Sequence, residues 1–225
     1  MKFGFLSFIL PVLMIAAMQH LLYAETVEDF YANLIREEEY KEHAERKLQD
    51  GRYLDAHKDY EKAVDLNPFD VTAFVGRGNA RYKLKNYRAA SRDYEKALIL
   101  RPDDANALML RGLARYQLGY YPAAIFDFSR VLALCPEKQD ACLMRGHTFF
   151  LLKEYNAAVK DYTRVLELQP ANAKVLYNRA RARWLLGEKA GSIADYRQAA
   201  LLGLKIAADW LKEQGYDHDQ LKGGD

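Results

Sequence analysis

The chain has 225 residues, which is enough for one sizeable hydrophobic core or a short array of repeats. Half of the residues are hydrophobic and 28% are charged, as in an ordinary folded protein, so composition argues against a long flexible linker or low-complexity segment. The formal net charge of +2 is too small to suggest nucleic-acid binding, although residues 25–68 are net acidic and residues 69–225 net basic.

The N-terminus predicts a targeting segment. Lys2 is followed by an apolar run without Asp, Glu, Lys or Arg before Glu25. One basic residue, an apolar stretch and a small residue are the layout of a secretory signal peptide over residues 1–24, cleaved after Ala24. The alternative is an uncleaved membrane anchor, because residues 3–24 could cross about 30 Å of hydrocarbon as a helix. Either interpretation places the rest of the protein in the periplasm or another extracytoplasmic space.

Residues 25–36 predict a separate lead-in helix. Thr26 followed by Asp29 resembles an N-cap with its reciprocal acid. Three apolar residues would form one short side of this helix: Phe30, Leu34 and Ile35. The helix could cap the repeats that follow or mediate self-association, and the sequence leaves both open.

From residue 37 onward the sequence repeats with a period of 34 residues, visible in columns of proline, glycine, alanine and aromatic residues. These columns are Pro68, Pro102, Pro136 and Pro170; Gly78, Gly112 and Gly146; Ala56, Ala90, Ala124 and Ala158; Tyr60, Tyr94, Phe128, Tyr162 and Tyr196; and Tyr53, Tyr87, Tyr121 and Tyr155. Each unit is expected to hold two helices, because proline lacks an N–H and ends the second one. Small residues allow the helices to approach closely, and the aromatic column fills the gap between units.

This pattern resembles the tetratricopeptide repeat (TPR). The family's order of aromatic, Gly, Ala-x-x-x-aromatic and Pro occurs as Phe74, Gly78, Ala90, Tyr94 and Pro102. The resemblance implies an all-α fold, a right-handed α-solenoid of about five helix-turn-helix units with a C-terminal capping helix. Its units would be 37–70, 71–104, 105–138, 139–172 and a degenerate 173–204. Residues 205–225 would form the capping helix and a loose tail, with the end of the array covered by Ile206, Trp210 and Leu211.

Two charged columns keep the same period. They are Asp59, Asp93, Asp127, Asp161 and Asp195, and Arg77, Arg111, Arg145 and Arg179. An anion-binding ladder would need only the arginines, whereas equal periodicity of both signs favours Arg–Asp pairs between facing helices. Such pairs would specify helix register and belong to the scaffold. The sequence does not show which Asp each Arg meets.

No catalytic, metal-binding or phosphate-binding motif stands out. The five histidines are scattered, and neither a zinc spacing nor a glycine-rich phosphate loop occurs. We therefore expect a protein that is not an enzyme and needs no cofactor, metal or small-molecule substrate. Cys135 and Cys142 are the only cysteines. One is expected in a turn and the other in a helix, so their Cα atoms should lie beyond the ~7 Å limit for a disulfide. The alternative is that the two cysteines are bridged.

The TPR resemblance implies that the first helix of each unit lines a concave face where partner segments bind. The residues placed there are Val75, Asn79, Tyr82, Met109, Leu110, Leu113, Tyr116, Leu143, Met144, His147, Phe150, Tyr177, Arg181 and Trp184. Met, Tyr and Trp suit adaptable or anchoring contacts, so an amphipathic helix or extended apolar segment is the expected ligand. The alternative is that part of this stripe packs against neighbouring helices or the cap.

Some TPR proteins hold acidic C-terminal tails with Lys, Asn and Arg in this groove. Only Asn79 fits that pattern, since Val75, Leu110 and Met144 stand where polar or basic residues would be needed. That partner class is therefore excluded. The sequence predicts a non-catalytic scaffold or adaptor outside the cytoplasm that binds another envelope or secreted protein and no nucleic acid. The alternative is a membrane-tethered structural or accessory subunit that acts through self-association as a homo-oligomer.

Overall fold

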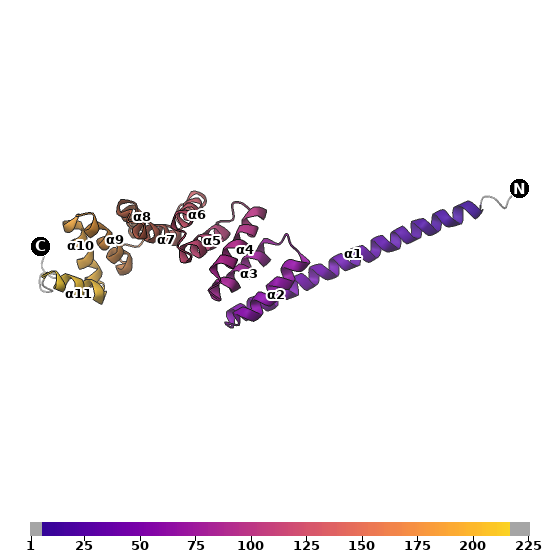
Figure 1. Ribbon diagram of the computed structural model, residues 1–225, viewed down its shortest axis with the longest axis horizontal. Coiled ribbons are helices and arrows are strands. Elements are labelled where there is room, and N and C mark those ends of the chain that lie inside the picture. The colour runs from indigo at the N-terminus through magenta and orange to yellow at the C-terminus, as the bar shows by residue number, and fades with distance from the viewer. Residues whose placement is uncertain (1–5, 217–225) are drawn as a thin grey trace. The chain divides into compact units, whose positions relative to one another are not determined.

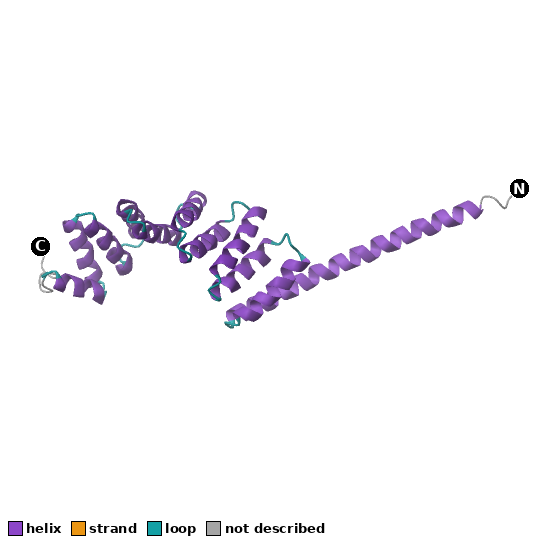
Figure 2. Ribbon diagram, in the orientation of Figure 1, coloured by secondary structure: helices purple, strands orange, loops and turns teal. Residues whose placement is uncertain are grey.

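The computed structural model describes residues 6–216, with side chains from Thr26 onward. Over this range the chain forms eleven α-helices and no strand, which confirms the predicted all-α fold. Short loops join the helices (Figure 2). The contacts divide the chain into two compact units, of which the first ends at Lys85 and the second begins at Asn86.

The first unit holds α1 (Leu6–Gln49), α2 (Tyr53–Leu66) and α3 (Val71–Lys83). The carboxyl-terminal part of α1 packs beside α2, while its amino-terminal part extends beyond both other helices (Figure 1). The predicted signal peptide or anchor starts outside the described residues, and the side chains of its remainder also lie outside them. Among the helices that the structure describes, none combines the length and hydropathy that a membrane span requires.

The separate lead-in helix predicted over 25–36 is wrong, because this stretch lies inside the 44 residues of α1. Thr26 is therefore an interior residue of a helix and does not cap one. The physical reason is that neither Gly nor Pro occurs from Val12 to Asp50, so the backbone ladder runs on without a break. Gly51 follows with φ of 75°, a left-handed conformation that ends the helix.

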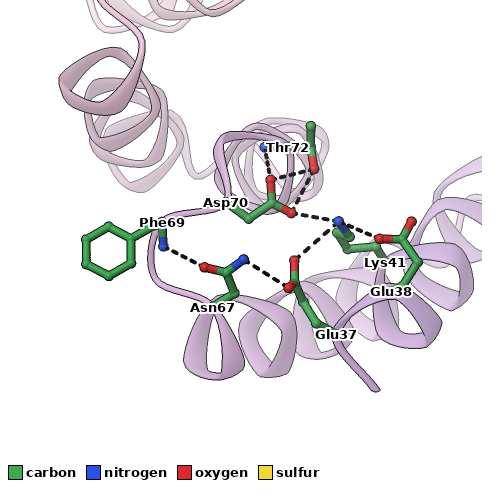
Figure 3. Close-up of polar contacts among 7 residues, drawn as sticks. All are labelled: Glu37, Glu38, Lys41, Asn67, Phe69, Asp70 and Thr72. Atoms are coloured by element: carbon green, nitrogen blue, oxygen red, sulfur yellow. Dashed lines mark hydrogen bonds and ion pairs between the residues drawn. The ribbon is translucent and has the colours of Figure 1, made fainter. Parts of the chain in front are cut away.

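A polar cluster fixes α1 to the turn between α2 and α3 (Figure 3). Lys41 Nζ lies 2.8 Å from Asp70 Oδ2, 2.8 Å from Glu38 Oε2 and 3.2 Å from Glu37 Oε1. Glu37 is buried, and its Oε2 accepts a hydrogen bond of 3.0 Å from Asn67 Nδ2. Because the Lys41 ammonium pairs with two carboxylates of α1 and with Asp70 before α3, this cluster sets the register of α1 against α3.

The cluster controls the ionisation of Asp70, which also caps α3 by accepting from the Thr72 N–H. Burial would raise the pKa of Asp70, but hydrogen bonds, led by that from Lys41, lower it to about 2. A carboxyl whose pKa is depressed below its unfolded value of about 3.9 stabilises the fold above that pH. This contribution is lost as the pH falls from about 4 towards 2.

We expect Asp70→Asn to lower the free energy of unfolding by about 1–2 kcal/mol at pH 7, because asparagine keeps the cap but loses the charge opposite Lys41. The deficit should shrink below about pH 4, where wild-type Asp70 takes up its proton. Urea unfolding followed by circular dichroism at pH 7 and pH 3 measures both values. Asp104→Asn is the matched control, since Asp104 caps α5 and pairs only with exposed Arg101 at 3.3 Å. An equal loss in the control would contradict the assigned role of Lys41.

The second unit is a series of helices in which each packs against the next. They are α4 (Tyr87–Leu100), α5 (Ala105–Gln117), α6 (Tyr121–Leu134), α7 (Gln139–Leu151), α8 (Tyr155–Leu168), α9 (Ala173–Leu185), α10 (Lys189–Leu201) and α11 (Lys205–Glu213). The first helices of successive repeats begin 34 residues apart, at Ala105, Gln139 and Ala173, so the period of the sequence is the period of the structure. Asp104 and Asn172 start two of them by capping Ala107 and Val175 N–H groups.

The aromatic column forms the buried core of this unit and explains the glycine column. Phe128 and Tyr162 are at most 1% exposed. A Cβ at Gly112 would lie 2.7 Å from Phe128 Cε1, and one at Gly146 would lie 3.0 Å from Tyr162 Cε1. A side chain at either glycine would therefore push the ring of the same repeat out of its place.

The Arg–Asp pairs predicted from the charged columns are confirmed within this unit. Each arginine meets the aspartate sixteen residues later, on the second helix of its own repeat. The pairs Arg111–Asp127, Arg145–Asp161 and Arg179–Asp195 each have an Nη2–Oδ1 distance of 2.7 Å. Arg145 Nη1 also donates to Ser129 Oγ at 3.0 Å, on the preceding repeat, so the arginine connects three helices.

The C-terminal helix α11 covers the last repeat, with one residue different from the prediction. The Trp210 ring stacks on Tyr196 at 3.9 Å, and Leu211 is buried. Ile206, however, is 53% exposed, and Ala207 is buried in its place. Ala207, Trp210 and Leu211 share a helix face by i, i+3, i+4 spacing, whereas Ile206 lies about 100° away from Ala207 on the helix. The predicted loose tail, 217–225, lies outside the described residues.

Candidate binding groove

The predicted groove residues of the second unit lie on the first helices of its repeats, α5, α7 and α9. Arg181 is exposed, and the remaining ones are half-buried. Val75, Asn79 and Tyr82 are half-buried residues of α3 in the first unit. None of the predicted residues is therefore sealed in the core, and the geometry of the second unit can be built from α5, α7 and α9 alone.

Side chains of α5 and α7 line an open pocket of about 610 Å³, called here the α5–α7 pocket. It brings together four of the predicted residues: Met109, Leu113, Leu143 and Met144. The rest of its lining is Ala105, Asn106, Cys135, Lys138 and Asp140. Cys135 comes from the turn before α7, and Leu110 does not line the pocket, so the predicted stripe and the actual pocket overlap only in part.

A second pocket, of about 200 Å³, follows towards the carboxyl ends of these helices and is called here the α7–α9 pocket. Its lining is Tyr116, His147, Phe150, Leu151, Tyr162, Asn178 and Arg181. Tyr162 was missed as a groove residue, because its column was assigned to the core. A signal was present in the sequence, since Phe128 at the equivalent position shows that the repeat needs no hydroxyl there.

The α7–α9 pocket presents neutral donors and one cation. His147 Nε2 lies 2.9 Å from Asn178 Nδ2, and burial lowers the pKa of His147, so a neutral ring accepts from the amide at pH 7. Burial raises the pKa of Tyr162, which therefore keeps its phenolic proton. The Arg181 guanidinium lies 4.8 Å from the centre of the Phe150 ring and 5.8 Å from that of Tyr177.

Tyr177 and Trp184 were predicted as groove residues, but they line neither pocket and contact the end of the array. The Tyr177 ring packs edge-on against Tyr196 at 5.6 Å. The Trp184 ring packs edge-on against Trp210 at 4.9 Å and lies under Lys189 at 5.7 Å. For these two side chains, packing against the last repeat and the capping helix accounts for their position.

Within the described part of the chain, no group of His, Cys, Asp and Glu could hold a metal ion. Cys135 is an exposed free thiol and Cys142 a buried one. Burial raises the pKa of Cys142, which packs as a small apolar residue.

A helix pair repeated at constant length, with open pockets along the first helices, defines an α-helical repeat protein. Family models for the tetratricopeptide repeat match residues 41–90 and 85–146, and one for the TPR repeat matches residues 146–187. Together they cover more than half of the chain, which belongs to the tetratricopeptide-repeat family.

Solved structures show the same fold. A crystal structure of MamA protein has a TM-score of 0.71 at 20% identity, covering 77% of this chain and 94% of that one. MamA 41-end from Desulfovibrio magneticus RS-1 has a TM-score of 0.71 at 17% identity, covering 74% and 94%. YrrB, titled a TPR protein with an unusual peptide-binding site, has a TM-score of 0.70 at 20% identity, covering 77% and 90%. No protein with a curated function matches the chain in sequence.

Proposed function

We propose that this protein is a non-catalytic scaffold that binds a segment of another protein in the groove of its second unit. The observation that carries the proposal is the α5–α7 pocket of about 610 Å³, whose lining includes Met109, Leu113, Leu143 and Met144. Apolar side chains gathered in an open concavity gain free energy when a partner covers them, at about 25 cal/mol per Å² of apolar surface. The TPR fold supports a protein-binding role independently.

The groove favours an amphipathic helix or an extended apolar segment as ligand. Methionine has three rotatable bonds and a polarizable sulfur, so Met109 and Met144 can adjust to different apolar side chains. A long stretch of acidic tail is disfavoured, because Leu110 and Met144 put apolar groups where such a tail needs donors. The structural likeness to YrrB, whose title names a peptide-binding site, supports peptide binding in general terms.

We further propose that binding takes place outside the cytoplasm and that the partner is an envelope or secreted protein. The support is the layout of residues 1–24, with one basic residue, an apolar run and Ala24 directly before Glu25. Mass measurement of the mature protein distinguishes a cleaved signal peptide, which begins the chain at Glu25, from a retained anchor.

The second candidate function is a membrane-tethered accessory subunit that associates with itself. One observation favours it: α1 carries four large apolar side chains that are 47–64% exposed, namely Phe30, Tyr31, Leu34 and Ile35. Light scattering tests this function, and a monomer at micromolar concentration would count against it.

Site-specific crosslinking in the native envelope tests the groove. Benzoylphenylalanine at position 113 is expected to capture one protein partner, because residue 113 lines the α5–α7 pocket. The control is the same probe at position 160, since Lys160 is exposed on α8 and lines neither pocket. Mass spectrometry identifies the product. Capture of the same protein from both positions, or of only a second copy of the chain, would overturn the scaffold proposal.

A further inference from the structure

The arginines near the groove are neutralised, with one exception. Arg111 and Arg115 share Asp127, Arg145 pairs with Asp161, and Arg179 and Arg183 share Asp195, all with nitrogen–oxygen distances of 2.7–2.8 Å. Arg181 is exposed and makes no ion pair within residues 26–216. Its guanidinium lies over the Phe150 and Tyr177 rings, Arg181 lines the α7–α9 pocket, and its N–H donors stay available.

A second donor lies in the same pocket. Tyr162 is 1% exposed, yet it lines the α7–α9 pocket, and its hydroxyl makes no hydrogen bond to any residue that the structure describes. Phe128 occupies the equivalent core position one repeat earlier without a hydroxyl. The hydroxyl of Tyr162 is therefore dispensable for packing, and its donor is available to a ligand in the pocket that Tyr162 lines.

We propose that the α7–α9 pocket binds the carboxylate of an aspartate or glutamate side chain within the partner segment, between the Arg181 guanidinium and the Tyr162 hydroxyl. This inference rests on the proposed function and names the chemistry of its ligand. A guanidinium and a phenol match the single negative charge of a carboxylate. A pocket of about 200 Å³ has room for the side chain of an aspartate or a glutamate.

The positions of the two pockets predict how far apart the apolar anchor and the acidic residue lie in the partner segment. Leu143 and Met144 line the α5–α7 pocket, while His147, about one turn further along α7, and Phe150, about two turns further, line the α7–α9 pocket. Neighbouring helices lie about 8–10 Å apart, so the apolar pocket and Arg181 are separated by roughly 10 Å. Extended chain rises about 3.3 Å per residue, so the acidic residue should follow or precede the apolar anchor by about three positions.

Selection from a random peptide library on the full-length chain tests this ligand. The wild-type chain is expected to enrich peptides with an apolar residue and an acidic residue about three positions apart. Arg181→Gln is expected to keep the apolar preference and lose the acidic one. Lys160→Gln removes the same charge from an exposed site on α8 outside both pockets and should select like wild type.

A double-mutant cycle on the best selected peptide measures the contact between its acidic residue and Arg181. Changing its acidic residue from Glu to Gln should weaken binding to wild type about tenfold, as expected for a charge-assisted hydrogen-bonded contact, and leave binding to Arg181→Gln unchanged. Tyr162→Phe, which copies the native Phe128, should weaken the Glu peptide several-fold and spare the Gln peptide. Fluorescence anisotropy of labelled peptides gives the dissociation constants.

The outcomes separate the two proposals. Apolar peptides without an acidic preference, bound equally by wild type and Arg181→Gln, would overturn the carboxylate site and leave the groove intact. Failure of the wild-type chain to enrich any peptide would instead contradict the groove itself. Enrichment of peptides whose only acid is the terminal carboxylate would also overturn the assignment of a side-chain carboxylate.

Discussion

Asp127→Ala is expected to lower the free energy of unfolding by about 3–5 kcal/mol, the largest loss that any single exchange of a charged residue should cause here. Asp127 is fully buried on α6. Its carboxylate accepts from Arg111 Nη2 at 2.7 Å, from Arg111 Nε at 3.1 Å and from Arg115 Nη1 at 2.8 Å. Removing it leaves two largely buried guanidinium groups without a counter-charge, and the desolvation already incurred by both is no longer offset.

The matched control for this prediction is Asp103→Ala. Asp103 is 71% exposed and pairs with Arg130 at 2.6 Å, so the ion pair is as short as those of Asp127 but lies in water. Surface pairs of this kind contribute only about 0–1 kcal/mol. Guanidinium denaturation followed by circular dichroism compares the two variants. Similar losses for both would show that burial does not set the strength of these pairs.

The Arg–Asp pairs show how much of the structure the sequence period can predict. Columns of both signs with one period predicted that Arg and Asp would meet, and they do. Periodicity alone could not choose the partner, because Arg111 has one aspartate sixteen residues ahead and another eighteen residues behind, and a shift by one repeat leaves the pattern unchanged. The choice follows from the hairpin of α5 and α6, which places Asp127 opposite Arg111.

The errors at both ends of the array have local causes. Thr26 and Asp29 fit a capping box, but the same residues are tolerated inside a helix, and only the lack of Gly and Pro after Val12 indicated that α1 continues. On α11 the prediction included Ile206, whereas the helix face that contains Trp210 and Leu211 covers Ala207 instead. The position of a residue on the helix, and not its hydrophobicity alone, decides whether it is buried against the last repeat.

The candidate groove was likewise predictable from the sequence only in part. Four groove residues predicted from repeat spacing meet in the α5–α7 pocket, because their columns fall on one face of each first helix. Four residues of the α7–α9 pocket were placed on the groove face from repeat spacing, but Tyr162 was not, because it comes from the second helix of a repeat. Periodicity treats all members of a column alike, and only the structure shows that Tyr162 lines one pocket with Arg181.

Leu113→Arg is expected to weaken binding of the partner segment at least about 30-fold, because it places an uncompensated charge in the pocket that the segment's apolar side chain must enter. Leu113 is half-buried in the free protein, so a longer side chain can reach water there, and helical content and melting temperature should stay unchanged. Leu168→Arg makes the same exchange at a 46% exposed position of α8 that lines neither pocket, and it should bind like wild type. Titration of the segment captured from position 113 into both variants measures the difference. A Leu113→Arg protein that binds as tightly as Leu168→Arg would remove the α5–α7 pocket from the binding site, since no other part of the proposed contact needs residue 113 to be apolar.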